Sequence, residues 1–392
     1  MREEVSEMAR GTDVSSFKEA YKTPVQADFP AQLEIKLGQA TIRYEPVDTA
    51  LRYGTNPHQP FAAYRPVIDP QADATLSVGD LTMLKGGKAG LSLTNIQDMS
   101  QAYNLLKYFK KPACVAMKHI VPCGFKAQTE GEALGDLYNR ARLSDERSHF
   151  GSVVGFNRRV DEETAERVME SFVECVIAPG YTNGALKVLR SNEGTKKLNN
   201  SIRVAQAGNM DKLPKYVGDD VDGFLNIRSL ADGTITLEVP YLTRIRSAND
   251  FVQDPMIPNP DGKDYIVETA PTQEQLSDAL TAWYLNVGVR SNGIVFVRNG
   301  AALAVGTGEQ ERVGAVEQAI DKAHKKGHSL EGSVMSSDAF FPNRDSIDAA
   351  AEAGVSTIVW PAGSMNDKHV IEAANEHDIA LIATLERCFL HI

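Results

Sequence analysis

The architecture of this chain is clearest in one stretch, Val115-Ala116-Met117-Lys118-His119-Ile120-Val121-Pro122-Cys123-Gly124. Its apolar start predicts a buried strand, which we expect to end on Lys118 and His119, because a Pro-x-Gly turn follows at once. In open α/β sheets ligands bind beyond the carboxyl ends of strands, so this turn would present both basic side chains at such a place. A Lys-His pair on the surface without any function is the competing interpretation.

The chemistry of the Lys118–His119 pair favours a role in proton transfer. A cation beside an imidazole favours the neutral ring, which can then accept a proton near neutral pH. The lysine can stabilise negative charge that develops on a reacting group.

Helices and strands are predicted to alternate on both sides of this stretch. Apolar residues at helical spacing, preceded by a Ser or Thr cap, predict a helix over 93–109. An Asn-Gly turn at 299–300 predicts a hairpin of 293–297 with 301–305. Further helices are predicted over 129–143, 161–171, 185–189, 273–287, 346–353 and 366–376, strands over 151–156, 173–178, 357–360 and 379–383, and a hairpin or edge strand near 33–43. This alternation predicts an α/β fold with a mostly parallel sheet.

The length of 392 residues exceeds what one compact core usually holds and predicts two domains. We expect an N-terminal extension over residues 1–47, a first domain over 48–262 and a second domain over 263–392. The Pro-rich segment 254–262 is the best candidate for a linker. Both domains carry the same alternation, which allows two domains of one fold.

Composition narrows the class of protein. Hydrophobic residues make up 42% and charged residues 24%, as in ordinary globular proteins. A net charge of −11 without a basic stripe argues against a nucleic-acid partner. The amino terminus does not resemble a signal peptide, no apolar run is long enough to span a membrane, and the four cysteines form no Cys-x-x-Cys pair. These features predict a cytoplasmic protein without disulfides.

Metal and nucleophile motifs are missing from the sequence. His324 and His328 are four residues apart but lack the zincin pattern, and the deaminase signature of His-x-Glu with Pro-Cys-x-x-Cys does not occur. No Gly-x-Ser-x-Gly elbow occurs either. We therefore expect no zinc and no metal ligand among the site residues.

Two other segments allow opposing interpretations. Gly306-Thr307-Gly308 leads from a strand into a helix and could bind an anion through free amides, although it matches neither phosphate-loop nor dinucleotide fingerprints. Phe340 and Phe341 could form an edge on which a planar ligand stacks, or a core pair beneath a helix cap.

Taken in order, these pieces resemble the AICAR transformylase family, the phosphoribosylaminoimidazolecarboxamide formyltransferases of purine biosynthesis. The resemblance covers residues 47–392. The matching motifs are Arg52-Tyr53-Gly54-x-Asn56-Pro57-His58-Gln59, Lys118-His119-x-x-Pro122-x-Gly124, Ile177-Ala178-Pro179-Gly180-Tyr181, Ser291-Asn292, Gly306-x-Gly308-x-Gln310-x-Arg312, Ser336-Ser337-Asp338-Ala339-Phe340-Phe341-Pro342 and Arg387-x-x-x-His391.

The resemblance implies a fold, a reaction and an assembly. The fold would be two tandem cytidine-deaminase-like α/β domains without the deaminase zinc. The enzyme would transfer a formyl group from 10-formyltetrahydrofolate to the 5-amino group of AICAR, giving formyl-AICAR and tetrahydrofolate. It would act as a homodimer with shared active sites, with no nucleic-acid or membrane partner. A structural monovalent cation in the second domain is left open.

The resemblance also implies residue roles. His119 would be the general base for the aromatic amine, and Lys118 would stabilise the oxyanion or help to protonate the leaving folate nitrogen. Asn292, Arg312 and Phe340 are expected from the partner subunit. The residues expected to bind AICAR or folate are Arg52, Tyr53, Gly151, Glu174, Asn292, Arg312, Phe340, Arg387 and His391.

Several departures from the family pattern weaken individual roles. Glu174 stands where Asp is usual, and Ser152 replaces an expected acid after Gly151. Residues 1–47 are too short for the IMP cyclohydrolase domain of bifunctional members, which predicts a stand-alone transformylase. Two alternatives remain: a nucleotide hydrolase or deaminase of the same fold, and a nucleotide-binding or regulatory protein without catalysis.

Overall fold

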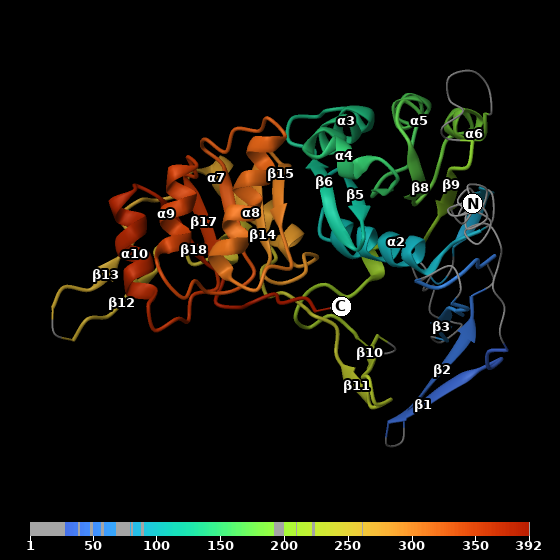
Figure 1. Cartoon of the computed structure of the whole chain (residues 1–392), viewed down its shortest axis with the longest axis horizontal. Coiled ribbons are helices and arrows are strands. Elements are labelled where there is room, and N and C mark those ends of the chain that lie inside the picture. The colour runs from blue at the N-terminus through green and yellow to red at the C-terminus, as the bar shows by residue number, and fades with distance from the viewer. Residues whose placement is uncertain are drawn as a thin grey trace, which may run out of the picture.

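The computed structural model describes residues 28–37, 40–47, 50–55, 59–67, 79, 81–87, 90–191, 200–208, 210–221, 224–260 and 262–391 (Figure 1). The first half of the main body consists of β4 (Thr82–Gly86), α2 (Leu93–Leu106), β5 (Ala113–Lys118), β6 (Val121–Ala127), α3 (Leu134–Ser144), α4 (Glu146–His149), β7 (Ser152–Phe156), α5 (Glu162–Val168), β8 (Val173–Ala178), α6 (Asn183–Arg190) and β9 (Arg203–Gln206). The second half consists of α7 (Gln273–Asn286), β14 (Ile294–Arg298), β15 (Ala301–Gly306), α8 (Arg312–Lys325), β16 (Val334–Ser337), α9 (Asp345–Glu352), β17 (Thr357–Trp360), α10 (Asp367–Glu376) and β18 (Ala380–Ala383).

These strands form one sheet across both halves. The described strands are ordered β18-β17-β16-β14-β15-β6-β5-β7-β8-β9-β4 in an 11-stranded sheet. The α/β class is confirmed, but the mostly parallel sheet is wrong: among these strands six neighbouring pairs are antiparallel and four are parallel. Five of the antiparallel pairs involve the two central hairpins, β5–β6 and β14–β15, and the sixth is the edge pair of β4 with β9. The predicted boundary at residue 262 stays a prediction, since the sheet itself runs on without a break.

The two halves repeat one order of elements at a constant spacing. In each, a helix precedes a hairpin, and three further strands follow with helices between them. Helices α2 and α7 begin at residues 93 and 273, an offset of 180, and the hairpin turns at residues 119 and 299 have the same offset. The halves meet where β6 and β15 pair antiparallel, at Lys126 and Ala301.

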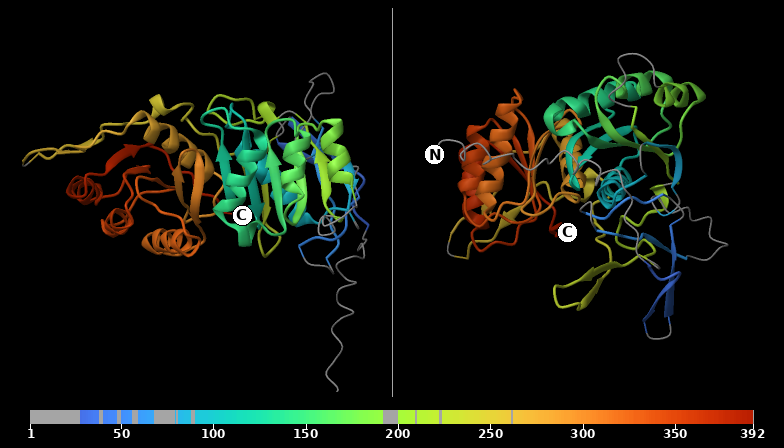
Figure 2. Two further views of the ribbon diagram at one scale, coloured as in Figure 1. Left: turned by 90° about the horizontal axis from the view of Figure 1, so that it is seen from above. Right: turned by 45° about the vertical axis from the view of Figure 1, so that its right-hand side comes forward.

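Helices cover both faces of the sheet, as the two views in Figure 2 show. Alternate residues of β5 and β14 point to opposite faces, so Val115 and Val295 pack in one core with α2 and α7. On the other face, Cys114 packs with α3, α5 and α6, and Phe296 packs with α8, α9 and α10. None of the described helices is long and apolar enough to cross a bilayer.

Helix α2 shows why the periodic segments fold as predicted. Ser92 caps its first turn, since its hydroxyl accepts a hydrogen bond from the Asn95 amide while the Asn95 side chain accepts one from the Ser92 amide. The helix ends at Leu106, three residues before the predicted end. Thr272 and Gln275 form the same capping box at the start of α7.

The turn after β5 lies earlier than predicted. His119 and Ile120 have φ values of 55° and 68°, so these two residues form the hairpin turn, and Pro122 and Gly124 belong to β6. Gly124 is needed inside the strand, because a Cβ there would lie 1.9 Å from the Ala141 carbonyl oxygen of α3. The Pro-x-Gly turn was therefore the wrong interpretation of a close helix–strand approach.

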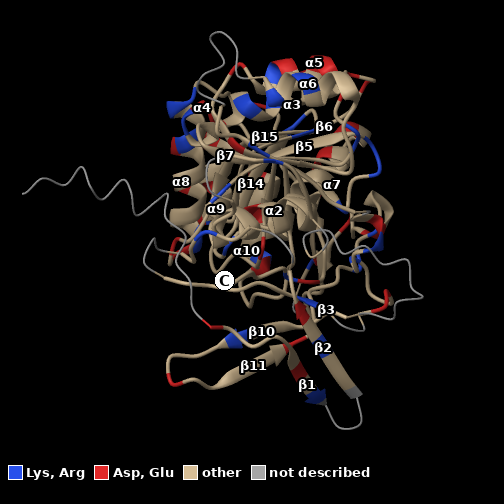
Figure 3. Ribbon diagram, turned by 90° about the vertical axis from the view of Figure 1, so that its right-hand side faces the viewer, with Lys and Arg blue, Asp and Glu red and all other residues tan. Residues whose placement is uncertain are grey.

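Smaller hairpins extend from the body. They comprise β1 (Leu33–Leu37) and β2 (Ala40–Pro46) with β3 (Tyr64–Pro66), β10 (Asn226–Ser229) with β11 (Ile235–Glu238), and β12 (Met256–Ile257) with β13 (Tyr265–Ile266). Two short 3-10 helices, Met210–Lys212 and Ala248–Asp250, lie in the same connecting region. The hairpin near 33–43 is confirmed, and the linker candidate 254–262 contains β12. β1–β2 and β10–β11 project from the same end of the molecule (Figures 1 and 3).

Candidate active site

The predicted site residues gather at one end of the sheet, which we call the Lys118 end. Strand β5 ends there, and its antiparallel neighbours β6 and β7 begin there. Strands β8 and β9 run parallel to β7, so they too begin at this end, close to Glu174 and Arg203. Strands β15, β16 and β18 end there, followed in the chain by Arg312, Phe340 and Arg387. Strand β5 presents its carboxyl end at the Lys118 end, as expected, whereas β7 and β8 present their amino ends there.

The β5–β6 turn carries the Lys-His pair. His119 is exposed at the tip of the turn, whereas Lys118 is half-buried at the last position of β5. The Lys118 amine donates a 2.5 Å hydrogen bond to the Phe150 carbonyl oxygen, which places it next to Gly151. A Cβ on Gly151 would lie 3.9 Å from the same amine, which is an ordinary contact, so the feature that favours glycine here is its φ of 75°.

A charged cluster surrounds Glu174. Its Oε1 lies 3.3 Å from Nη1 of Arg203 and 3.9 Å from Nη2 of Arg52, and it accepts a 3.2 Å hydrogen bond from Asn95. The Arg52 guanidinium also lies over the Tyr53 ring, 4.5 Å from its centroid. Burial, with Arg203 close by, lowers the pKa of Arg52 from its ordinary value. Asn56, Pro57 and His58 of the same motif lie outside the described residues.

The second half supplies a group centred on Asp338. This fully buried carboxylate pairs with Arg312 and accepts a 2.5 Å hydrogen bond from the Ser291 hydroxyl. The Asn292 side chain donates hydrogen bonds of 3.0 and 3.2 Å to the carbonyl oxygens of Glu309 and Gln310.

The C-terminal segment completes this second group. The Arg387 guanidinium lies 4.8 Å from the centroid of Phe389, whose ring meets that of His391 at 5.7 Å. Arg387 and His391 are exposed. Phe340 is 41% exposed while Phe341 is fully buried, so Phe341 belongs to the core and the stacking of a planar ligand on Phe340 stays a prediction.

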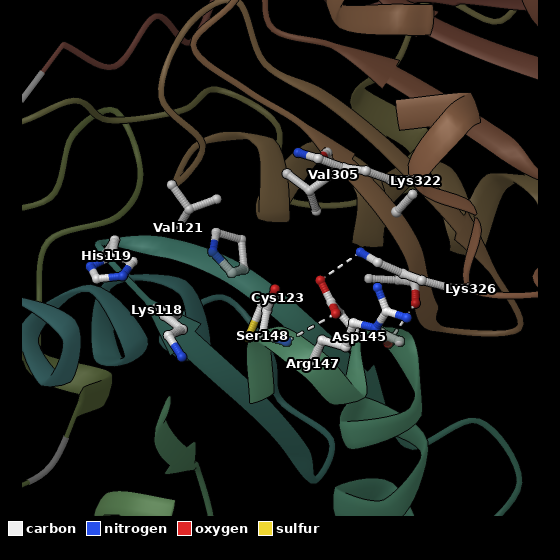
Figure 4. Close-up of a pocket in the computed structure, with 14 residues that line it drawn as sticks. Lys118, His119, Val121, Cys123, Asp145, Arg147, Ser148, Val305, Lys322 and Lys326 are labelled. Atoms are coloured by element: carbon white, nitrogen blue, oxygen red, sulfur yellow. Dashed lines mark hydrogen bonds and ion pairs between the residues drawn. The ribbon is translucent and has the colours of Figure 1, made fainter. Parts of the chain in front are cut away.

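A pocket opens beside the Lys-His pair. It has a volume of about 380 Å³ and lies where the first half meets β15 and α8. Lys118 and His119 lie at one side of it, and Lys322 and Lys326 lie at the other (Figure 4). Arg147 also lines it, so the pocket suits an anionic ligand.

Part of the positive charge around the pocket is neutralised by Asp145. Asp145 lies 2.5 Å from the Lys326 amine, and although burial opposes its ionisation, hydrogen bonds from Lys326 and Ser148 lower the pKa of Asp145. Burial and the neighbouring Lys326 lower the pKa of Lys322. Burial, together with Arg142 and Lys118, lowers the pKa of His149 to about 4, so this buried ring is neutral at pH 7.

Sequence reasoning missed several residues of this end of the sheet. Arg203 and Asn95 contact Glu174. Asp98 of α2 is 5% exposed and accepts a hydrogen bond from the Ile120 amide. Asp98 could have been noticed in the sequence, because it is a charged residue on the buried face of the helix predicted over 93–109. Lys322 and Lys326, four apart near the end of α8, were a second signal. Arg203 could not be predicted from the sequence, because its partner Glu174 lies on another strand and no spacing in the sequence indicates the contact.

The structure offers no metal-binding group within its described ranges. No three His, Cys, Asp or Glu side chains gather there in a way that could hold an ion. We accordingly assign no residue to the monovalent cation that the sequence left open.

Comparison with known proteins identifies the family of this chain. Residues 13–322 match the family described as the AICARFT/IMPCHase bienzyme. The chain belongs to this family. The bifunctional purine biosynthesis protein PurH of Caldicellulosiruptor bescii is 36% identical over 344 residues, which are 87% of this chain and 59% of that protein. The chain thus spans less than two thirds of the length of this AICARFT/IMPCHase relative.

A solved structure gives a much weaker match. It is the diaminohydroxyphosphoribosylaminopyrimidine deaminase/5-amino-6-(5-phosphoribosylamino)uracil reductase of Thermotoga maritima, 24% identical, with a TM-score of 0.24 over 28% of this chain and 37% of that chain.

Proposed function

We propose that the chain transfers a formyl group from 10-formyltetrahydrofolate to the 5-amino group of AICAR, forming formyl-AICAR and tetrahydrofolate in purine biosynthesis. The observation that carries the proposal is the position of the Lys118–His119 turn in a member of the AICARFT/IMPCHase family. This turn lies beside a basic pocket at the end of the sheet where the other motif residues gather.

His119 acts as the general base in this proposal. The amine of AICAR is a poor nucleophile, because its lone pair is delocalised into the ring and the carboxamide. Attack on the formyl carbon makes the amine nitrogen more acidic, and the exposed imidazole at the turn removes its proton. Collapse of the tetrahedral adduct breaks the bond from the formyl carbon to the folate nitrogen, which takes up a proton as tetrahydrofolate leaves.

Lys118 supplies positive charge next to this step. Its amine is held by the Phe150 carbonyl oxygen, so a cation is fixed beside the reacting group before the reaction starts. A preorganised donor of this kind stabilises the oxyanion of the tetrahedral adduct more than it stabilises the neutral formyl group. In the alternative role, the Lys118 ammonium would protonate the leaving folate nitrogen.

The remaining motif residues bind the substrates in this proposal. Arg52 and Arg387 suit the phosphate, because guanidinium groups form bidentate contacts with phosphate oxygens. Gly151 adjoins Lys118 and is assigned to folate in this proposal, and Phe340 provides an exposed ring on which a planar group can stack. Tyr53, Glu174, Asn292, Arg312 and His391 complete the AICAR and folate contacts.

We further propose a homodimer in which each active site uses both subunits. Each group of motif residues is held by its own contacts, one around Glu174 and one around Asp338. The β10–β11 hairpin offers an apolar surface for a second copy, since Ile235 is 63% exposed and Leu237 43% exposed. We also propose that the two halves are tandem, zinc-free, deaminase-like domains. The protein acts in the cytoplasm in this proposal.

An assay with both substrates tests the proposal. Purified protein is mixed with AICAR and 10-formyltetrahydrofolate, and the formation of tetrahydrofolate is followed against controls lacking either substrate. We expect turnover that requires both substrates. Binding of AICAR by calorimetry without any turnover would instead favour a nucleotide-binding protein and would refute the transferase.

A further inference from the structure

The turn that carries His119 has an unusual backbone. Both of its residues are in the left-handed region, with φ of 55° at His119 and 68° at Ile120. Two-residue hairpin turns of this type strongly favour Asn-Gly, because residues other than Gly, Asn, Asp and His rarely adopt positive φ. A β-branched residue such as Ile120 is an outlier there and persists only where its surroundings hold it.

Asp98 provides the contact that holds this turn. Its Oδ1 accepts a 2.6 Å hydrogen bond from the Ile120 amide. The carboxylate comes from α2, a capped helix packed on β5 and β7, and is only 5% exposed. A hydrogen bond from a backbone amide to a buried carboxylate is stronger than one between neutral groups, so this contact fixes the turn relative to the helix.

In the second half too, an aspartate of the preceding helix accepts hydrogen bonds from the amides of a hairpin turn, but that turn has no Lys-His pair. Asp278 of α7 accepts hydrogen bonds of 2.7 Å from the amides of both Asn299 and Gly300, the turn of the β14–β15 hairpin. Asp98 precedes its turn by 21 residues, and so does Asp278. The second turn has the favoured Asn-Gly sequence, whereas the first has His-Ile and depends more on its aspartate.

We propose that Asp98 is a positioning residue for the formyl transfer, which holds the left-handed His119–Ile120 turn so that the imidazole faces the bound amine. This inference rests on the proposed function. Asp98 acts through the backbone of the turn and is not itself a catalytic residue. The proposal predicts that its loss affects turnover far more than substrate binding.

The charges around Asp98 are consistent with this role. His119 on the turn and Glu174 on β8 both act on the carboxylate, and Arg203 and Arg52 in turn surround Glu174. Burial raises the pKa of Asp98 to about 6, although the amide of Ile120 and the His119 side chain act in the opposite direction. The carboxylate is thus mostly ionised, and a strong acceptor, at pH 7.5.

Steady-state kinetics of full-length variants test the proposal, with the twin aspartate as matched control. We expect Asp98→Ala to lower kcat about 100-fold, as misplacement of a catalytic group does, with KM for AICAR within about threefold of wild type. Asp98→Asn keeps an acceptor oxygen and should lose no more than about tenfold. Asp278→Ala should lower the melting temperature yet leave kcat within about threefold of wild type.

Amide hydrogen exchange gives a readout that does not need turnover. The Ile120 amide should exchange at least about tenfold faster in Asp98→Ala than in wild type, while in Asp278→Ala the change falls on Asn299 and Gly300. A folded Asp98→Ala variant with wild-type kcat, or with unchanged exchange at Ile120, would overturn the positioning role. An equal loss of kcat in Asp278→Ala would do the same. A wild-type protein without turnover would instead count against the proposed function.

Discussion

Oε1 of Glu174 lies 3.3 Å from Nη1 of Arg203, and both side chains belong to the Lys118 end of the sheet. The Arg203 side chain is 5% exposed and that of Glu174 is 34% exposed, so the pair is shielded on one side only. The same carboxylate oxygen lies 3.9 Å from Arg52. The Glu174 carboxylate therefore partly neutralises the guanidinium groups of Arg203 and Arg52. Arg52 is one of the residues proposed to bind the nucleotide.

The first prediction concerns this pair. Glu174→Gln keeps the size of the side chain but removes the negative charge beside buried Arg203. It should lower the free energy of unfolding by about 1–3 kcal/mol, measured by urea denaturation at pH 7. The control is Glu34→Gln, which removes an exposed partner of Arg43 and should cost less than about 0.5 kcal/mol. Equal losses in the two variants would contradict this account of Glu174.

The second prediction concerns the pH dependence of stability. The folded-state pKa of Asp98, about 6, lies above its ordinary value of 3.8, so between these values the native state binds more protons than the unfolded state. The contribution of Asp98 to the free energy of unfolding is thus greatest below about pH 4 and falls as the pH rises to about 6.

The measurement is the difference between wild type and Asp98→Asn. Between pH 4 and pH 7 the free energy of unfolding should shift by about 1–3 kcal/mol in favour of the Asn variant, which cannot ionise. His119 and Glu174 are present in both proteins, so most of their own titration cancels in the difference. A difference that stays constant across this range would mean that Asp98 ionises with its ordinary pKa.

The third prediction tests sites shared between subunits. His119→Ala and Arg387→Ala should each be nearly inactive alone. If each site takes His119 from one subunit and Arg387 from the other, unfolding and refolding an equal mixture should restore about a quarter of wild-type activity, because half of the dimers are mixed and each has one intact site. Sedimentation of the same sample verifies that dimers have formed. No recovery in a dimeric mixture would place both residues in one subunit's site.

Much of the fold followed from periodicity alone. Strands β8 and β17 match their predicted ranges residue for residue, and the Asn299-Gly300 turn was correctly predicted, because apolar runs and an Asn-Gly pair are local signals. Helix α3 begins at Leu134 instead of residue 129, since the amides of Thr129 and Glu130 bond to the Glu132 side chain and form a loop. The direction of each strand was not predictable in the same way, because it depends on pairing between distant residues.

The site was predictable only in part, for a similar reason. The Lys118–His119 pair was visible in the sequence, but its turn was misplaced, because Ile120 gives no local sign of a left-handed backbone. What holds that backbone is Asp98, 22 residues away from Ile120 in the chain. Contacts such as Glu174 with Arg203 are equally long-range and leave no spacing to detect. The sequence thus indicated the Lys-His pair but not the distant side chains that contact its turn.

The most direct test of the central claim is the rate of formyl transfer by wild type and His119→Ala, followed as tetrahydrofolate formation from AICAR and 10-formyltetrahydrofolate. His324→Ala, which removes an exposed histidine of α8, is the control. We expect wild type and His324→Ala to turn over at similar rates and His119→Ala to be about 10²- to 10⁴-fold slower, the usual cost of losing a general base. Wild-type turnover by a folded His119→Ala variant would contradict the account.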